Sequence, residues 1–216
     1  MPLADPKDRK GFTLVELLVS MTILIIITVA VTTDISISRQ QEELASNVRF
    51  VRSMVRDVQS RAQSATSLNT CDNGTNIAVC ELDTANCGAG ACDTQIVPNR
   101  QGLRFSTTHP DYFIHFAEVD PLLVNAQYDG DEEVQRIFLQ STRSSVIRVE
   151  VADLMIDGSQ SVDTVDITFN RQSGHMQFED PLGVTGNLLG ITLTHRETGR
   201  SEVVSLNAVT GKITIE

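Results

Sequence analysis

The first pattern along the chain is one long apolar run near the N-terminus. Residues 12–33 contain a single ionisable side chain, Glu16, in a stretch that is otherwise hydrophobic or hydroxyl-bearing. A helix over this range would be about 33 Å long, which is enough to cross the hydrocarbon core of a bilayer. We therefore predict a transmembrane helix half at residues 12–33.

Beyond this run the polarity rises, but a helical period continues through residues 34–67. Apolar side chains recur at spacings of 4 and 3 residues, at Leu44, Val48, Val51, Val55, Val58, Ala62 and Ala65. Such a stripe is typical of an amphipathic helix, and no glycine or proline separates it from the apolar run. The heptad spacing also permits a coiled-coil seam, but the small, β-branched residues favour packing on a sheet.

The second half of the chain has short runs of alternating polarity, typical of strands separated by turns. They lie at residues 112–116, 145–151, 165–169, 175–178, 190–194, 203–206 and 212–215. Turn residues lie at 170–174, and Thr198-Gly199 and Thr210-Gly211 suit hairpin connections. The order of the elements predicts an α+β fold, with a long helix packed on an antiparallel meander in a β-rich head at residues 68–216.

The stretch at residues 68–100 has the composition of a loop and contains all four cysteines, Cys71, Cys80, Cys87 and Cys92. An even count in an exported segment indicates two disulfides, with three possible pairings that the spacing leaves open. Four thiolates could instead hold zinc, but there is no Cys-x-x-Cys pair to favour a metal site. We expect two disulfides that brace the loop.

The distribution of charge limits the classes of partner. The chain of 216 residues has 28 acidic and 17 basic side chains and a formal net charge of −11, which argues against a broad nucleic-acid surface. Two of its few lysines, Lys7 and Lys10, precede the apolar run and favour a cytoplasmic N-terminus. Four arginines of the amphipathic half, Arg49, Arg52, Arg56 and Arg61, are expected to form a solvated face paired with acidic neighbours.

Residues 9–19, Arg-Lys-Gly-Phe-Thr-Leu-Val-Glu-Leu-Leu-Val, resemble the prepilin leader of type IV pilins and type II secretion pseudopilins. The resemblance implies a leader peptide at residues 1–11 that prepilin peptidase removes after Gly11. It also implies N-methylation of the new first residue, Phe12, and a role for Glu16 in assembly. Many major pilins carry a helix-kinking proline near the end of the apolar segment. None is present here, which favours a minor pilin or a pseudopilin.

The resemblance also implies a pilin-like fold and a structural role in a type IV pilus or type II secretion filament. The expected partners are prepilin peptidase, other pilin or pseudopilin subunits, the inner-membrane assembly platform and membrane lipid. The protein would cross the inner membrane once, with its N-terminus cytoplasmic and its head periplasmic or extracellular, before it enters the filament. A DNA-uptake minor pilin is the alternative within this class, and a signal-anchored periplasmic enzyme or binding domain is the alternative outside it.

Local motifs for other chemistry are few. Residues 129–133 gather four carboxylates beside a glycine, but their spacing does not fit a helix-loop-helix calcium site, so a solvated acidic turn is favoured. The four histidines, His109, His115, His175 and His195, are scattered and form no nucleophile motif. We therefore expect no enzymatic activity, no catalytic residue, no cofactor and no metal.

Overall fold

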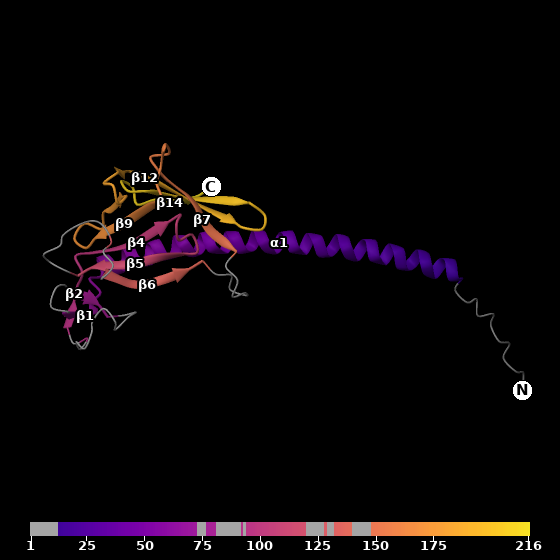
Figure 1. The fold of residues 1–216 in the computed structure, drawn as a ribbon, viewed down its shortest axis with the longest axis horizontal. Coiled ribbons are helices and arrows are strands. Elements are labelled where there is room, and N and C mark those ends of the chain that lie inside the picture. The colour runs from indigo at the N-terminus through magenta and orange to yellow at the C-terminus, as the bar shows by residue number, and fades with distance from the viewer. Residues whose placement is uncertain are drawn as a thin grey trace, which may run out of the picture. The chain divides into compact units, whose positions relative to one another are not determined.

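The computed structural model describes residues 13–72, 77–80, 92, 94–119, 128, 132–139 and 148–216. The chain divides into two compact units, Met1–Gln41 and Glu42–Glu216. The first unit contains the apolar part of the N-terminal helix, and the second contains the rest of that helix together with all the strands (Figure 1).

One continuous α-helix, α1, extends from Leu14 to Gln63, as the uninterrupted helical pattern predicts. Its C-terminal end is set by Ala65, which has a left-handed backbone with φ of 53°. The amide of Thr66 then donates a hydrogen bond to the carbonyl of Arg61 at 3.4 Å, as in a Schellman motif. Ala65, expected on the apolar stripe, therefore lies past the helix end and is exposed.

In the part of the chain that the structure describes, the strands form three antiparallel sheets. A small sheet has the order β2-β1-β3, from Leu68–Asp72 (β1), Ile77–Val79 (β2) and Thr94–Ile96 (β3). A six-stranded sheet has the order β11-β10-β9-β4-β5-β6, from Arg100–Ser106 (β4), Tyr112–Glu118 (β5), Glu133–Phe138 (β6), Thr164–Asn170 (β9), Met176–Glu179 (β10) and Thr185–Gly186 (β11). A five-stranded sheet has the order β14-β13-β12-β7-β8, from Val149–Ile156 (β7), Gln160–Ser161 (β8), Leu188–His195 (β12), Ser201–Asn207 (β13) and Ile213–Ile215 (β14).

The apolar stripe of α1 packs on the two larger sheets. Its members Leu44, Val48, Val51, Val55, Val58 and Ala62 are each at most 3% exposed. They share one core with side chains such as Phe105 of β4 and Leu193 of β12. Figure 1 shows the second half of α1 running alongside β4 and β7. Packing on a sheet is thus confirmed, and the coiled-coil alternative is wrong, because the stripe is already buried within its own chain.

The strands are antiparallel, as predicted, and most neighbours are consecutive in the chain, but two central pairings depart from a simple meander. β4 lies between β5 and β9, and β12 lies between β7 and β13. These pairings join segments about 60 and 40 residues apart in the chain, such as Arg104 with Asp166 and Leu193 with Val151. Alternation of polarity predicts that a run is a strand, but it does not specify which distant strand lies beside it.

The described residues of the cysteine-containing stretch include three short strands where the sequence predicts a loop. Its described residues form the small sheet, in which Cys71 of β1 lies opposite Ala78 of β2. A second core, separate from the main one, contains Leu68 and Val79 together with Ala117 of β5. These strands are only three to five residues long, which is too short for an alternating pattern to stand out in a stretch of loop-like composition.

Candidate functional site

The functional candidate with the most support is the N-terminal segment, of which the structure describes the part from Thr13 onwards. Gly11 and Phe12, the predicted cleavage and methylation residues, lie outside the described residues. Glu16 lies in the first turn of α1 and is exposed.

Thr13 caps the helix. Its hydroxyl Oγ1 accepts a hydrogen bond from the amide of Glu16 at 3.3 Å, and its carbonyl accepts one from the amide of Leu17 at 3.2 Å. Glu16 therefore occupies the third helical position, where a carboxylate also interacts favourably with the positive end of the helix dipole. The sequence analysis missed this role, although the pattern Thr-x-x-Glu before an apolar run is a recognised signal for a helix start.

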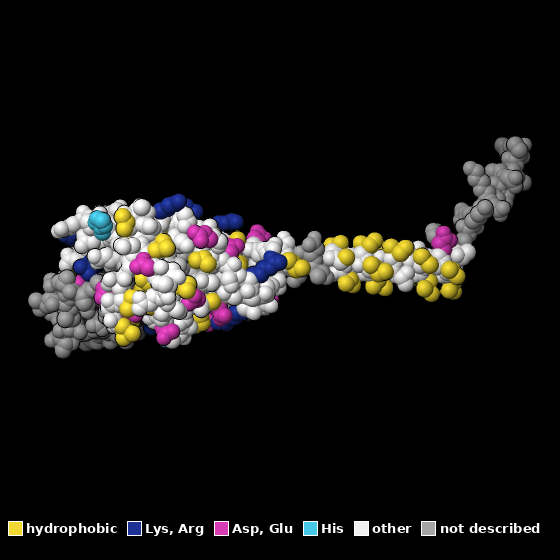
Figure 2. Space-filling model, turned by 90° about the horizontal axis from the view of Figure 1, so that it is seen from above, with side chains coloured by type: hydrophobic (Ala, Val, Ile, Leu, Met, Phe, Trp, Pro, Cys, Tyr) yellow, Lys and Arg dark blue, Asp and Glu magenta, His cyan; other side chains and the backbone are white. Residues whose placement is uncertain are grey.

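The segment after Glu16 exposes apolar side chains around its whole circumference. Exposed residues include Leu24 at 67%, Ile26 at 68% and Val29 at 60%. Figure 2 shows hydrophobic side chains along the whole length of this segment. A helix that is apolar on all sides is stable only in an apolar environment, such as a membrane or a bundle of similar helices.

The hydroxyl groups of this segment are satisfied within the helix. Ser20 donates to the carbonyl of Glu16 at 2.7 Å, Thr22 to that of Val19 at 2.8 Å, and Thr28 to that of Leu24 at 2.7 Å. Thr32 donates to the carbonyl of Thr28 at 2.9 Å. Because these groups have partners, they add little to the free energy of transfer into lipid.

Length and composition also suit a membrane span. The most apolar window of α1 has a mean hydropathy of 2.7, and none of it is buried within the described chain. Together with the basic N-terminal tail, this indicates membrane anchoring, as predicted.

Two of the four cysteines form a disulfide in the described chain. Cys80 and Cys92 are bonded with their Cα atoms 6.0 Å apart, a separation normal for a disulfide. Cys71 is also disulfide-bonded and is buried beside Ala78. Cys87 lies outside the described residues.

The predicted acidic turn lies partly outside the described chain, which includes only its last two residues. Glu132 is 4% exposed, and Glu133 accepts hydrogen bonds from Arg136 and from the hydroxyl of Tyr128. These two carboxylates are therefore less solvated than expected. Among the described residues, no group of three or more Asp, Glu, His or Cys side chains is arranged to hold a metal ion.

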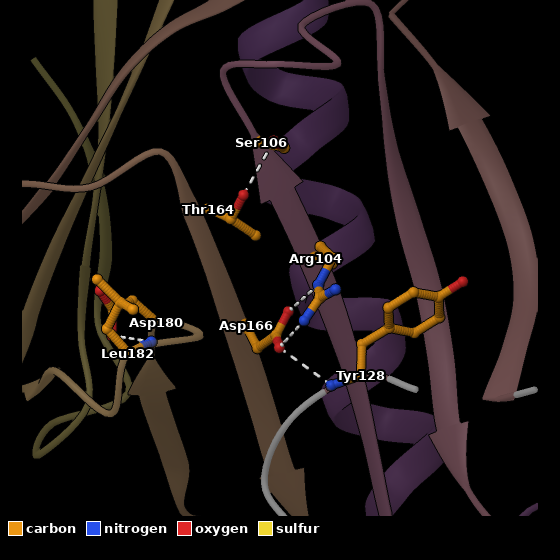
Figure 3. Close-up of polar contacts among 7 residues, drawn as sticks. All are labelled: Arg104, Ser106, Tyr128, Thr164, Asp166, Asp180 and Leu182. Atoms are coloured by element: carbon orange, nitrogen blue, oxygen red, sulfur yellow. Dashed lines mark hydrogen bonds and ion pairs between the residues drawn. The ribbon is translucent and has the colours of Figure 1, made fainter. Parts of the chain in front are cut away.

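A buried charge cluster joins β4, β9 and residue 128, and the sequence analysis did not anticipate it. The guanidinium of Arg104 donates two hydrogen bonds of 2.6 Å to the carboxylate of Asp166, which is fully buried (Figure 3). The amide of Tyr128 donates a third, at 3.0 Å, and the Tyr128 ring lies 4.6 Å from the guanidinium carbon. Burial and the nearby Glu133 carboxylate raise the pKa of Tyr128 to about 12.

The cluster has the contacts of a structural element. Both Asp166 oxygens already accept hydrogen bonds, so the carboxylate is held in place rather than directed at a ligand. Arg104 and Asp166 are direct cross-strand partners, and their ion pair links two strands that are far apart in the sequence.

Two of the histidines are exposed and two are buried. His109 and His175 are exposed, whereas His115 is 3% exposed and lies 3.2 Å from the side-chain oxygen of Gln101. Burial and the positive charge of Arg61 lower the pKa of His115 to about 4, against a smaller opposing effect of Asp57. His195 is fully buried, with Nε2 3.5 Å from a carboxylate oxygen of Glu43 on α1.

Comparison with known proteins agrees with the N-terminal features. Neither a search of curated proteins nor a search of solved structures found a significant match. Residues 6–32 match the family model described as the prokaryotic N-terminal methylation motif, and the matched range includes Gly11, Phe12 and Glu16. The resemblance seen in the sequence is thereby confirmed: the chain carries the prepilin motif of type IV pilins and pseudopilins, a structural class of protein.

Proposed function

We propose that the protein is a structural subunit of a type IV pilus or type II secretion filament. In this proposal prepilin peptidase cuts after Gly11, Phe12 is N-methylated, and the apolar part of α1 remains in the mature protein. The observation that carries the proposal is the methylation motif at residues 6–32, joined directly to a membrane-length helix with Glu16 as its single ionisable group.

The same features support a location and an order of events. The basic tail before the apolar segment favours a cytoplasmic N-terminus, so the β-rich head would be periplasmic until assembly. The assembly platform of the inner membrane would then move the helix from lipid into the filament. The described part of α1 is one continuous helix without proline, which supports a minor pilin or pseudopilin rather than a main shaft subunit.

Glu16 would act in assembly through the new α-amino group of Phe12. Cleavage places that amine four residues before Glu16, which permits a contact within one helix or between neighbouring subunits. In a filament core without water, such a pair would offset much of the desolvation of both charges, whereas an unpaired carboxylate would not be compensated.

The test compares Glu16→Gln with Glu42→Gln, which removes an exposed carboxylate from the polar part of the same helix. Glutamine at position 16 can still serve in a capping box, so the change removes the charge while leaving the helix start intact. We expect Glu16→Gln protein to be membrane-bound, shortened by residues 1–11 and methylated, yet poorly incorporated into filaments beside wild-type subunits.

The Glu42→Gln control should enter filaments normally. Intact mass of the extracted protein reports cleavage and methylation, and Gly11→Val should leave the precursor uncut. Wild-type protein that keeps its leader in a strain with active prepilin peptidase would falsify the proposed processing. Equal incorporation of Glu16→Gln and wild-type protein at matched expression would contradict the ion-pair role.

A further inference from the structure

Three arginines on the second half of α1 form a ridge that the described residues of this chain do not neutralise. Arg49, Arg52 and Arg56 follow one another at intervals of three and four residues, which places them on one side of the helix. Arg49 and Arg56 are exposed, and Arg52 is half-buried. Within the described chain none of the three has an ion-pair partner. We call these three residues the arginine ridge.

Most other arginines of the same unit are paired. Arg61, Arg100, Arg104, Arg136, Arg148 and Arg196 each have a carboxylate within 4.0 Å. Among the described residues of this unit, the basic side chains outside the ridge that lack an ion pair are Arg171, Arg200 and Lys212, and they come from separate turns between strands. Within the described part of the chain, the ridge is therefore a local concentration of uncompensated positive charge in an acidic protein.

This arrangement is unfavourable for the isolated subunit. Like charges three and four residues apart on a helix destabilise it by about 0.2–0.5 kcal/mol per pair. In addition, Nε of Arg52 is shielded from solvent and has no hydrogen-bond partner in the described chain. A buried donor without an acceptor costs free energy, which adds to the unfavourable terms of the isolated subunit.

A complementary surface lies on the β7–β8 hairpin and its connection to β9. Residues 149–170 contain five carboxylates and no lysine or arginine. Glu150 and Asp166 are paired with Arg196 and Arg104. The other three, Asp153, Asp157 and Asp163, have no basic partner in the described chain, and we call them the aspartate hairpin.

In the described chain, the side chains of the aspartate hairpin have neutral hydrogen-bond donors as partners or no partner. Asp153 accepts hydrogen bonds of 3.0 Å from the hydroxyl of Ser161 and from its neighbouring amide, and Asp157 accepts two from backbone amides. Asp163 is exposed. The ridge spans about 10 Å along the helix. Asp153 lies on β7 and Asp157 follows its last residue, so these two residues are at most about 13 Å apart along the chain, a length similar to that of the ridge.

We propose that the arginine ridge of one subunit docks on the aspartate hairpin of a second copy of this chain. The proposal rests on the filament function proposed above and names a contact between its subunits. Because the two surfaces lie on different parts of the molecule, the interface is heterologous, and repeated contacts of this kind generate a helical array when they do not close into a ring. A subunit with both surfaces can be present in more than one copy per filament.

Charge favours a second copy over nucleic acid as the occupant. Removal of residues 1–11 takes away three positive and two negative charges and leaves the mature chain at −12, which repels phosphate. Three arginines neutralise few phosphates, whereas they match three aspartates in number and length.

The first experiment uses the scarcity of lysine in this sequence. Lys212 is the only lysine beyond residue 11, so Arg56→Lys places a single new amine on the ridge. Carbodiimide joins a lysine to a contacting carboxylate without a spacer. Filaments are prepared from cells that express two chains, one with Arg56→Lys, Asp153→Asn and Asp163→Asn and the other wild type.

In this pair of chains, a link from position 56 to Asp153 or Asp163 can form only between copies. We expect that linked peptide in the mass spectrum. A link from position 56 to a different protein, or no link in filaments that contain both chains, would overturn the proposal.

The second experiment exchanges the charges. Arg52→Glu with Arg56→Glu should lower incorporation by about tenfold or more, because like charges placed opposite each other at an interface cost several kcal/mol. Adding Asp153→Arg and Asp163→Arg should restore it, and Arg200→Glu, a charge reversal in the turn between β12 and β13, should have little effect.

The outcomes separate this proposal from the proposed function. If wild-type chain is in filaments and the Arg52→Glu, Arg56→Glu variant enters them equally well, the docking contact is wrong while the filament function stands. Loss of DNA binding with normal incorporation assigns the ridge to nucleic acid and also overturns the contact. Absence of wild-type chain from filaments contradicts both.

Discussion

The buried pair of Arg104 and Asp166 allows a quantitative test of what holds the head together. Arg104→Met removes the guanidinium but keeps a side chain of similar length. Among the described residues, the carboxylate of Asp166, which is 0% exposed, then retains only the amide of Tyr128 as a donor. Removing one partner of a buried ion pair typically destabilises a protein by about 3–5 kcal/mol, because the remaining charge is desolvated and uncompensated.

Two further variants separate this effect from simple loss of contact area. Arg104→Met combined with Asp166→Asn removes the stranded charge while keeping an acceptor for Tyr128, so it should recover about 2 kcal/mol relative to Arg104→Met alone. Arg61→Met breaks the pair with Asp57, in which the two side chains are 48% and 46% exposed. That exposed pair should contribute about 0.5 kcal/mol or less.

The measurement is hydrogen exchange of the β4 and β9 amides in the full chain, solubilised in detergent with its disulfides intact and titrated with urea. Exchange of these amides reports the free energy of opening of the six-stranded sheet. If Arg104→Met destabilises the sheet no more than Arg61→Met, the pair is not an important contact between β4 and β9. If the double variant is less stable than Arg104→Met, the buried, unpaired carboxylate of Asp166 is not the cause of the instability.

Two other predictions concern the same unit. Because the folded-state pKa of His115 is lowered from 6.5 to about 4, unfolding takes up a proton between these values, and the head should lose about 3 kcal/mol of stability as the pH falls from 7 to 4. In urea titrations, His115→Gln should remove that part of the pH dependence. The exposed control His175→Gln should keep it. An unchanged pH dependence in His115→Gln would contradict the assignment of this effect to His115. Gly102→Ala places a Cβ against the Phe116 ring and 2.7 Å from the carbonyl oxygen of Ile167, and should destabilise the head by about 1–3 kcal/mol in the same assay. Gly190→Ala, whose nearest contact would be 3.6 Å away, is the matched control, and equal effects of the two changes would refute the steric argument.

Local periodicity predicted the elements well because it reflects which face of each element is buried. The stripe from Leu44 to Ala62 follows the helical period and is buried against the sheets. The run from Val165 to Phe169 was predicted as a strand and is the centre of β9. In both cases the apolar side chains repeat at the period of the structure that buries them.

Contacts between distant segments could not be predicted in the same way. Asp166 alone is a polar residue in a strand, and only the pairing of β9 with β4 places Arg104 opposite it. His115 is likewise one scattered histidine in the sequence, and the packing of β5 against α1 determines its burial. Buried polar side chains of this kind depend on which strands become neighbours. Strand pairing is determined by the packing of the whole core rather than by a local pattern.

The helix cap at Thr13 differs from these contacts, because the sequence contains a local signal for it, the Thr-x-x-Glu pattern. Glu16 was interpreted only as an assembly residue, and the threonine three positions earlier was read as part of the apolar run. The hydrogen bond between Thr13 and the Glu16 amide shows that this stretch also specifies where the helix begins. The two roles use different atoms, since capping uses the Glu16 backbone and the proposed ion pair uses its carboxylate.

The chemistry of α1 explains how one segment can suit both lipid and a helix bundle. A helix with apolar side chains on all sides and hydroxyls bonded to its own carbonyls presents nearly the same surface to either environment. Most of the segment therefore contributes little to the difference in free energy between the two states. Glu16 is the exception, because its charge is stabilised where a cationic partner is available and costs free energy where it is not. A single charged position can thus decide the direction of transfer, which is why the comparison of Glu16→Gln with Glu42→Gln is the most informative test of the proposed function.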